Sequence, residues 1–288
     1  MSSSCTHDLS GRVAIVTGAN NPLGLGRAIA VALAEAGADL FVTYYRQEVD
    51  VADPDAAPGE AYYMAQQSHH CSSAIEAIQR FGRRVEAWEV DLADPAAVPE
   101  LFDRAEAALG PVDILVNNAA HCVTDTFRPG GSEAAWGVAS GRISAETIDR
   151  HFAVNTRTPA LAMAEMGRRH HEAGRSWGRI INISTDAASQ FPGETSYGAS
   201  KYALEAYSKS AATELGGLGI TVNVISPGPI QTGYIPAELE QELSVHTPLG
   251  GVGRPGDVAD VAVFLASDAA RWLTGQIIYV GGGHRMPG

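Results

Sequence analysis

The chain alternates short apolar runs with longer segments of helical character, and this alternation constrains its fold more than any other feature. Seven runs rich in Val, Ile and Leu are interpreted as strands: 12–18, 38–44, 85–92, 112–118, 178–184, 220–226 and 276–280. Segments rich in Ala, Leu and Glu between them, at 26–37, 95–110 and 200–215, are interpreted as helices. Continuous apolar strands are typical of parallel sheets that are buried on both faces. The pattern predicts an α/β, doubly wound Rossmann fold: a parallel sheet of about seven strands with helices on both faces.

No break in composition divides the chain, so residues 1–288 are predicted to form a single domain. Two stretches interrupt the alternation, at 47–73, where helical character returns near Ser72, and at 121–145, which is rich in Gly and Ser. Connections of this length are usually functional or disordered, and ligands in this fold class bind beyond the carboxyl ends of the strands. Both stretches are interpreted as insertions near the site, with surface elaboration as the open alternative.

The charge of the chain limits its partners. A formal net charge of −13 argues against a nucleic-acid surface or an anionic membrane, because both require clustered Lys and Arg. The N-terminal residues lack the apolar stretch of a signal peptide, and no run has the length of a membrane span. We therefore expect a cytoplasmic protein.

The cysteines and histidines do not suggest a metal site. Cys5, Cys71 and Cys122 are far apart and odd in number, which favours free thiols over disulfides or a metal cluster. The pairs 69–70 and 170–171 are adjacent histidines, which do not share a face of a helix and are expected at the surface. No metal is predicted.

The first strand leads directly into the glycine-rich turn TGANNPLGLGRAIA, residues 17–30. Glycine lets a phosphate approach the main chain, and the free N–H groups of a helix that begins near Gly26 attract anions. Its position after the first strand and at the start of a helix favours dinucleotide binding. A tight turn without a ligand is the alternative.

The end of the second strand indicates which dinucleotide is bound. An acidic residue there binds the 2′-hydroxyl of NAD, whereas an Arg accommodates the 2′-phosphate of NADP. The segment FVTYYRQ has Tyr44 where the acid is expected, and Arg46 two residues later. A guanidinium can grip a phosphate with two hydrogen bonds, so NADP(H) is predicted over NAD(H). An ordinary exposed Arg46 is the alternative.

Tyr197 and Lys201 are four residues apart in SYGASKYALEAYSKS. On a helix such residues share a face, about 6 Å apart along the axis. An ammonium close to a phenol favours the phenolate and is expected to lower the Tyr pKa from about 10. A Tyr of this kind can exchange a proton with a carbonyl or alcohol oxygen. Taken alone, this spacing is also common on exposed helices.

Together these features resemble the short-chain dehydrogenase/reductase family over roughly residues 9–284, and within it the 3-oxoacyl-carrier-protein-reductase-like branch. The resemblance is carried by TGANNPLGLG, Asp91–Leu92, NNA at 117–119, Asn155 in HFAVNTRTP, Ser184 thirteen residues before Tyr197, YGASK, and PGPIQT at 227–232.

The resemblance implies a role for each matching position. The catalytic residues would be Asn155, Ser184, Tyr197 and Lys201, with Ser184 holding the substrate oxygen and Asn155 supporting an ordered water. The cofactor would contact Gly18, Asn20, Leu23, Gly24, Leu25, Gly26, Tyr44, Arg46, Asp91, Leu92, Asn118, Ala119, Ala120, Tyr197, Lys201, Pro227, Gly228, Ile230 and Thr232, and Asn117 would also flank the nicotinamide.

The sequence departs from the family pattern at the glycine turn. Five residues, ANNPL, separate TG from GLG, where the family usually has three; this resembles its enoyl-reductase relatives, although the YxxxK spacing is that of ketone and alcohol enzymes. The implied function is an NADP(H)-dependent oxidoreductase that transfers hydride between the nicotinamide and a ketone or secondary alcohol. Enoyl reduction, 3-oxoacyl-carrier-protein reduction, and a catalytically idle NADP-binding regulatory protein stay open as alternatives.

The expected partners are a small-molecule substrate and further copies of the chain. Docking of an acidic carrier protein requires cations near the cleft, which the run at 168–179 supplies, but Thr213 stands where carrier-dependent relatives have an Arg, so a carrier is disfavoured. Family members commonly pair the Tyr–Lys helix across a dimer or tetramer interface. The small residues of this helix, such as Ala203 and Ala211, favour a homodimer or homotetramer.

Overall fold

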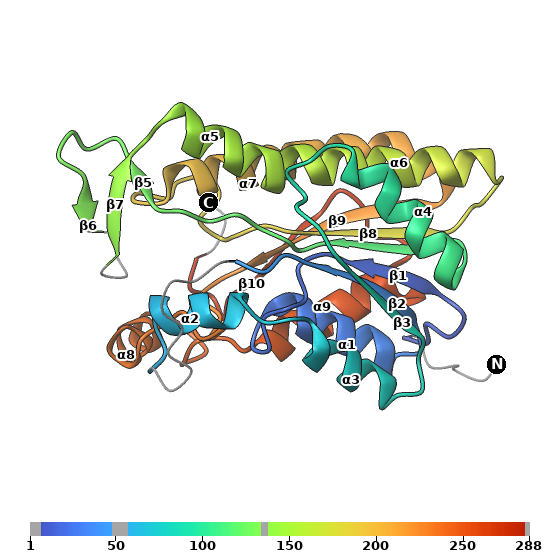
Figure 1. Ribbon diagram of the computed structural model, residues 1–288, viewed down its shortest axis with the longest axis horizontal. Coiled ribbons are helices and arrows are strands. Elements are labelled where there is room, and N and C mark those ends of the chain that lie inside the picture. The colour runs from blue at the N-terminus through green and yellow to red at the C-terminus, as the bar shows by residue number, and fades with distance from the viewer. Residues whose placement is uncertain (1–6, 48–56, 134–137, 286–288) are drawn as a thin grey trace.

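The computed structural model describes residues 7–47, 57–133 and 138–285. A seven-stranded parallel sheet forms its centre, in the order β10-β9-β8-β4-β1-β2-β3 (Figure 1). The strands are β1 (Val13–Val16), β2 (Asp39–Tyr44), β3 (Val85–Glu89), β4 (Ile114–Asn117), β8 (Gly178–Ile183), β9 (Ile220–Pro227) and β10 (Ile277–Val280). Each of the seven apolar runs forms one of these strands, and the predicted doubly wound fold is confirmed.

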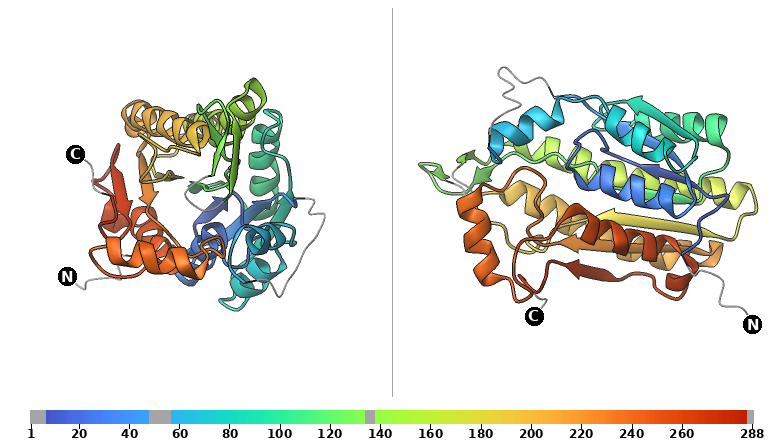
Figure 2. Two further views of the ribbon diagram at one scale, coloured as in Figure 1. Left: turned by 90° about the vertical axis from the view of Figure 1, so that its left-hand side faces the viewer. Right: turned by 90° about the horizontal axis from the view of Figure 1, so that it is seen from below.

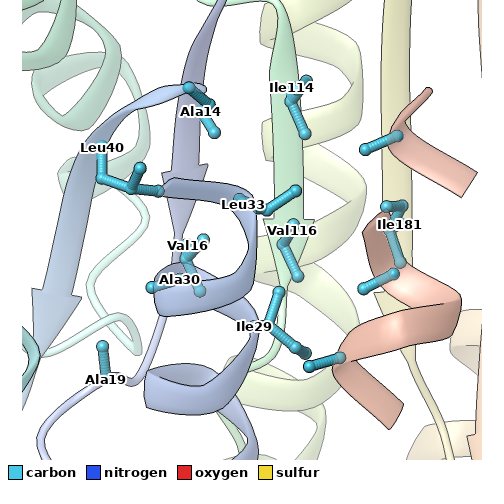
Figure 3. Packing of buried hydrophobic residues seen from close by; sticks show 14 of the residues in the cluster. Ala14, Val16, Ala19, Ile29, Ala30, Leu33, Leu40, Ile114, Val116 and Ile181 are labelled. Atoms are coloured by element: carbon cyan, nitrogen blue, oxygen red, sulfur yellow. The ribbon is translucent and has the colours of Figure 1, made fainter. Parts of the chain in front are cut away.

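Helices cover both faces of the sheet (Figure 1). One face carries α1 (Leu25–Glu35), α3 (Ser72–Gln79) and α9 (Pro255–Ala266), and the other carries α4 (Ala97–Leu109), α6 (Thr158–Glu172) and α7 (Thr195–Leu215). Successive strand residues point to opposite faces, so Val16 packs against Ile29 of α1 while Ile15 packs on the other side against Phe102 of α4. Figure 3 shows the first of these two apolar layers.

The stretch from 47 to 73 contains a helix that the sequence did not reveal. Helix α2 (Glu60–Gln67) precedes α3, so helical structure begins at Glu60 rather than near Ser72. Its composition, EAYYMAQQ, gives no continuous apolar face, and for this reason the periodicity was not visible. Helix α2 lies at the same end of the sheet as α8 (Ala237–His246) (Figures 1 and 2).

The stretch from 121 to 145 forms short strands beyond the same end of the sheet. Strands β5 (Asp125–Thr126), β6 (Ser132–Glu133) and β7 (Ala139–Arg142) pair in the order β5-β7-β6, and α5 (Ala145–Phe152) follows (Figure 1). Three short helices complete the chain: a π-helical segment η1 (Ala153–Arg157) between α5 and α6, and the 3₁₀ turns η2 (Gly216–Leu218) and η3 (Asp268–Ala270).

The arginine run at 168–179 lies far from this end. It spans the C-terminal end of α6 and the start of β8, at the amino edge of the sheet. Its four arginines all form ion pairs: Arg168 with Glu165, Arg169 with Asp103, Arg175 with Asp113 and Arg179 with Asp268. The run therefore does not supply cations near a cleft at the carboxyl ends of the strands, and that expectation was wrong.

The expectations about the cysteines and histidines had different outcomes. Cys71 and Cys122 carry free thiols, whereas Cys5 lies outside the described residues. His170 is buried and bonded to the carbonyl oxygens of Met166 and Trp177, so its predicted surface position was wrong. Among the described residues, no group of three or more His, Cys, Asp and Glu side chains is arranged to hold a metal ion. Within the same ranges, no helix is both long enough and apolar enough to cross a bilayer.

Candidate active site

A cavity of about 440 Å³ opens at the carboxyl edge of the sheet. Its wall is built from the glycine turn, the ends of β2, β3, β4 and β8, helix α7 and the loop after β9. Most of the residues expected from sequence meet there: Gly18, Asn20, Gly24, Leu25, Gly26, Tyr44, Asp91, Leu92, Asn118, Ala119, Ala120, Ser184, Tyr197, Lys201, Pro227, Gly228, Ile230 and Thr232. Ligands in doubly wound folds bind in such a position.

The glycine turn forms a cradle of bare backbone. Gly18 has φ of +76°, a conformation that favours glycine, and a Cβ on Gly26 would lie 2.1 Å from the Gly18 oxygen. Asn118 fixes the turn from the neighbouring strand, because its Nδ2 donates to the Thr17 and Gly18 oxygens at 2.8 and 3.0 Å. Helix α1 begins immediately afterwards at Leu25. Backbone N–H groups at a helix start with no side chain over them fit the pyrophosphate of a dinucleotide.

The wall beside β2 does not match the sequence expectation. Arg46 is not part of the cavity wall; its guanidinium forms two 2.8 Å hydrogen bonds with Glu89 at the end of β3, and Leu23 is also outside. Thr43 lines the cavity, and its buried Oγ1 has no hydrogen-bond partner among the described residues. Tyr45 and Gln47 line it too. A buried orphan hydroxyl at this wall fits a ligand with acceptor oxygens.

A cation that the sequence did not indicate lies beside Asp91 in the cavity wall. Arg150, on α5, lines the cavity, and its Nη2 is 3.0 Å from Oδ2 of Asp91. Sequence reasoning missed Arg150 because α5 is sixty residues from Asp91 along the chain, and only the tertiary fold brings the two together.

Tyr197 and Lys201 converge as predicted. Both lie near the start of α7 and line the cavity, with Lys201 Nζ 5.7 Å from the centre of the Tyr197 ring. Lys201 is almost fully buried, at 2% exposed, and its Nζ donates to the Ile183 oxygen at 2.8 Å, beside the end of β8. Because both residues line the cavity and lie close together, their side chains face the same space.

The expected acidification of Tyr197 is wrong for this structure. Burial raises the pKa of Tyr197 well above its usual value, and the neighbouring Cys122 and Glu194 raise it further. Burial also lowers the pKa of Lys201 to about 8. Desolvation disfavours both the phenolate and the ammonium, and it is the largest cause of both shifts.

Asn155 and Asn117 lie behind the cavity rather than in its wall. Asn155, in η1, accepts from the His121 N–H at 2.8 Å and donates to the His121 oxygen at 2.8 Å and to Ser200 Oγ at 3.0 Å. Asn117 donates to Asn182 at 2.7 Å and is buried, so the expectation that it flanks the nicotinamide was wrong. Asn155 thus clamps the loop after β4 to the Tyr–Lys helix.

Ser184 lies at the end of β8, with its proton directed away from the cavity. Its Oγ donates to Oε1 of Glu205, two turns along α7 from Tyr197, at 2.6 Å. Burial raises the pKa of Glu205, while the hydrogen bond from Ser184 opposes that rise. The next residue, Thr185, also lines the cavity; among the described residues its hydroxyl has no acceptor. Sequence reasoning missed Thr185, although its hydroxyl adjoins that of Ser184.

Two histidines join the loop after β4 to the site. His121 lines the cavity, and its ring lies 4.8 Å from that of His151 in an edge-to-face arrangement. His151 is fully buried; its Nε2 accepts from the Val123 N–H at 3.2 Å and its Nδ1 lies 2.6 Å from the Thr147 oxygen. These contacts fit a neutral ring with its proton on Nδ1. Burial also lowers the pKa of His121 to about 4, so the His121 ring is neutral at pH 7.

A family model matches most of this chain. The model described as Enoyl-(Acyl carrier protein) reductase matches residues 56–285. The chain belongs to the short-chain dehydrogenase/reductase family. The glycine cradle, the Asn118 clamp and the Tyr197–Lys201 pair are thus parts of a family enzyme, an oxidoreductase.

Relatives that cover nearly the whole chain agree with this assignment. An uncharacterized oxidoreductase, YjdA of Bacillus subtilis (strain 168), is 34% identical over 273 residues, covering 94% of this chain and 96% of the relative. The chloroplastic NADPH-dependent aldehyde reductase 2 of Arabidopsis thaliana is 38% identical over 284 residues, covering 96% of this chain and 94% of the relative. The crystal structure of a blue fluorescent protein from a metagenomic library in complex with NADPH superimposes with a TM-score of 0.76 at 32% identity, covering 97% of this chain and all of that one. These names agree with the NADP(H) preference predicted from sequence.

Proposed function

We propose that the protein is an NADPH-dependent reductase of small aldehydes and ketones. The observation that carries the proposal is that Tyr197 and Lys201 face one cavity together with the glycine cradle. The similarity to the NADPH-dependent aldehyde reductase and to the structure in complex with NADPH supports both the coenzyme and the carbonyl substrate.

The residues of the cavity have distinct roles in this proposal. When bound, NADPH supplies a hydride to the carbonyl carbon. Tyr197 donates its phenolic proton to the carbonyl oxygen, and its raised pKa suits an acid that must be protonated at neutral pH. Lys201 holds the nicotinamide ribose, as its family counterpart does, and Asn155 keeps the loop after β4 against α7.

A hydroxyl next to the phenol positions the carbonyl oxygen. Because the Ser184 proton is directed at Glu205, we assign the donor that meets the substrate oxygen to Thr185, while Ser184 fixes the end of β8 to α7. A donor aimed at the oxygen stabilises the negative charge that develops there.

Replacing the phenol tests the proposal. Tyr197→Phe should lower kcat for aldehyde reduction by about 10²- to 10⁴-fold, because it removes only the proton donor, and should leave NADPH affinity nearly unchanged. Oxidation of NADPH is followed by absorbance and its binding by fluorescence, with Tyr202→Phe, an exposed phenol on the same helix, as the control. A Tyr197→Phe enzyme with the wild-type kcat would exclude this mechanism.

One alternative reaction has its own support. The matching family model, described as Enoyl-(Acyl carrier protein) reductase, and the long glycine turn both favour enoyl reduction. Assaying a crotonyl thioester beside the aldehydes decides between the reactions. A protein that binds NADPH and oxidises it with neither substrate class would instead be a regulatory binding protein. Docking of an acidic carrier protein is disfavoured, since the cationic run at 168–179 lies at the opposite edge of the sheet from the cavity.

We also propose that copies of the chain associate through α6 and α7. A hollow of about 1130 Å³ runs between these helices. Small and apolar side chains line much of it, including Ala160, Leu161, Ala203 and Tyr207, and Asp149, Arg157 and Glu214 line it too. Leu161 and Tyr207 are exposed, and shallow apolar surfaces of this kind are typical of association faces.

A further inference from the structure

Two departures from the family pattern meet in space. The lengthened glycine turn, ANNPL, brings Asn20 against the C-terminal end of α2, the helix within the insertion at 47–73. Nδ2 of Asn20 donates to the Gln67 oxygen at 2.6 Å and to the Tyr45 oxygen at 3.4 Å. Asn20 is only 3% exposed, so this contact is shielded from water. The long turn therefore anchors the inserted helix.

The other end of α2 is anchored to the loop after β9. The N–H of Gly59 donates to the Gly233 oxygen at 2.9 Å, and Tyr62 packs so closely on Gly233 that a Cβ there would lie 3.0 Å from its ring. Tyr63 contacts Tyr234 edge to face at 5.3 Å. Asn21 of the glycine turn reaches the same loop, with Nδ2 3.5 Å from the Thr232 oxygen. Helix α2 thus bridges the glycine turn and this loop at the end of the sheet where the cavity opens (Figures 1 and 2).

Tyr63 and Gln67 of α2 both line the cavity, and Tyr63 is the one that acts electrostatically on Tyr197. It lines the same cavity as Tyr197, and its negative form is close enough to raise the pKa of Tyr197. Burial raises the pKa of Tyr63 itself to about 12, so its ring is a neutral, half-buried surface at pH 7. Tyr62, its neighbour on α2, faces Gly233 and is not part of the cavity wall.

We propose that Tyr63 determines which carbonyl compounds reach Tyr197, and that the lengthened glycine turn positions it. The selected class is aldehydes and ketones with an upper size set by the Tyr63 ring, which lines the same cavity as Tyr197. This inference rests on the proposed carbonyl reduction and adds a role for a helix outside the family motifs.

The selectivity between aldehydes of different size tests the role of Tyr63. The measured quantity is the ratio of kcat/KM for 1-naphthaldehyde to that for propanal, with NADPH saturating. Tyr63→Ala should raise this ratio about tenfold, because it removes the ring that limits size, and Tyr63→Trp should lower it. Tyr63→Phe, which retains the ring, and the control Tyr62→Ala should leave the ratio within about twofold. A general loss of stability changes both aldehydes alike and does not move the ratio.

A double-mutant cycle tests the positioning by the glycine turn. In an Asn20→Ala background, Tyr63→Ala should change the ratio by less than about threefold, because the helix is then no longer held in one place. NADPH affinity, measured by fluorescence for each variant, separates this effect from weakened coenzyme binding. Undiminished size selection by Tyr63 in that background would overturn the positioning role of Asn20.

The outcomes separate this inference from the proposed function. No NADPH oxidation by the wild type with either aldehyde would overturn both. A second outcome would overturn the inference about Tyr63 alone. In it, Tyr197→Phe loses turnover, but the ratio of kcat/KM for the two aldehydes stays within about twofold of wild type in both Tyr63→Ala and Tyr63→Trp.

Discussion

At the residue scale, burial shifts the protonation equilibria of the proposed catalytic pair. It raises the pKa of Tyr197 and lowers the pKa of Lys201, so both shifts are toward the neutral form. A lysine whose pKa lies at about 8 is still mostly cationic at pH 7, while Tyr197 retains its proton. The site without ligand thus holds a proton ready to be donated, which suits reduction of a carbonyl group.

The two hydroxyls beside this pair should differ in their effect on catalysis. Thr185→Ala should lower kcat/KM by about 10²-fold, since it removes the donor assigned to the substrate oxygen. Ser184→Ala should lower it by less than about tenfold, since it removes a bond to Glu205 behind the site. Steady-state kinetics with one aldehyde measures kcat/KM for both variants. Ser189→Ala, at an exposed serine four residues after Thr185, is the control. If Ser184→Ala lowers kcat/KM more than Thr185→Ala does, Ser184 rather than Thr185 is the donor to the substrate oxygen.

At the element scale, the register between β2 and β3 determines where Arg46 lies. Tyr44 at the end of β2 lies opposite Glu89 at the end of β3, and this register brings Arg46 to the Glu89 carboxylate. The pair is exposed, so the ion pair is weak, and the contact of Arg46 with a phosphate stays a prediction that requires Arg46 to leave Glu89. The sequence did not indicate the pairing with Glu89, because pairing between strands is not visible along the chain.

Competition for Arg46 gives a prediction about the coenzyme. Arg46→Ala should weaken NADPH binding about tenfold and change NADH binding by no more than about twofold, because only NADPH carries the 2′-phosphate. Glu89→Gln should strengthen NADPH binding by releasing Arg46. Fluorescence titration with each coenzyme measures these changes, and Arg84→Ala, which breaks the Asp39 pair at the other end of β2, serves as the control. Equal losses for both coenzymes in Arg46→Ala would exclude a phosphate contact.

At the scale of the whole molecule, helix α7 contributes to both the cavity and the proposed association surface. Helix α7 carries the catalytic pair near its start and, further along, lines the hollow that it shares with α6. Association through this face would cover the exposed Leu161 and Tyr207 and brace the helix that holds Tyr197. The carboxyl edge, where α2 and the loop after β9 lie, stays open to substrate.

A charge placed in this hollow should separate the copies. Leu161→Arg should convert an oligomer into monomers at micromolar concentration, because a buried unpaired guanidinium is costly at an interface. Sedimentation velocity measures the change, with Leu249→Arg, at an exposed leucine outside the hollow, as the control. A wild-type protein that sediments as a monomer would refute the association, as would an oligomer that Leu161→Arg leaves intact.

By itself, the sequence determined the parallel sheet, the glycine cradle and the Tyr–Lys pair. These features are local: apolar runs mark buried strands, glycines mark a turn with left-handed backbone, and a spacing of four marks one face of a helix. Only the tertiary structure decided which groups are buried and what they meet. It reversed the expected pKa shift of Tyr197, paired Arg46 with Glu89, directed Ser184 to Glu205, and brought α2 against the glycine turn. Desolvation and contacts between distant segments depend on the packed arrangement of the whole chain, and no short stretch of sequence records them.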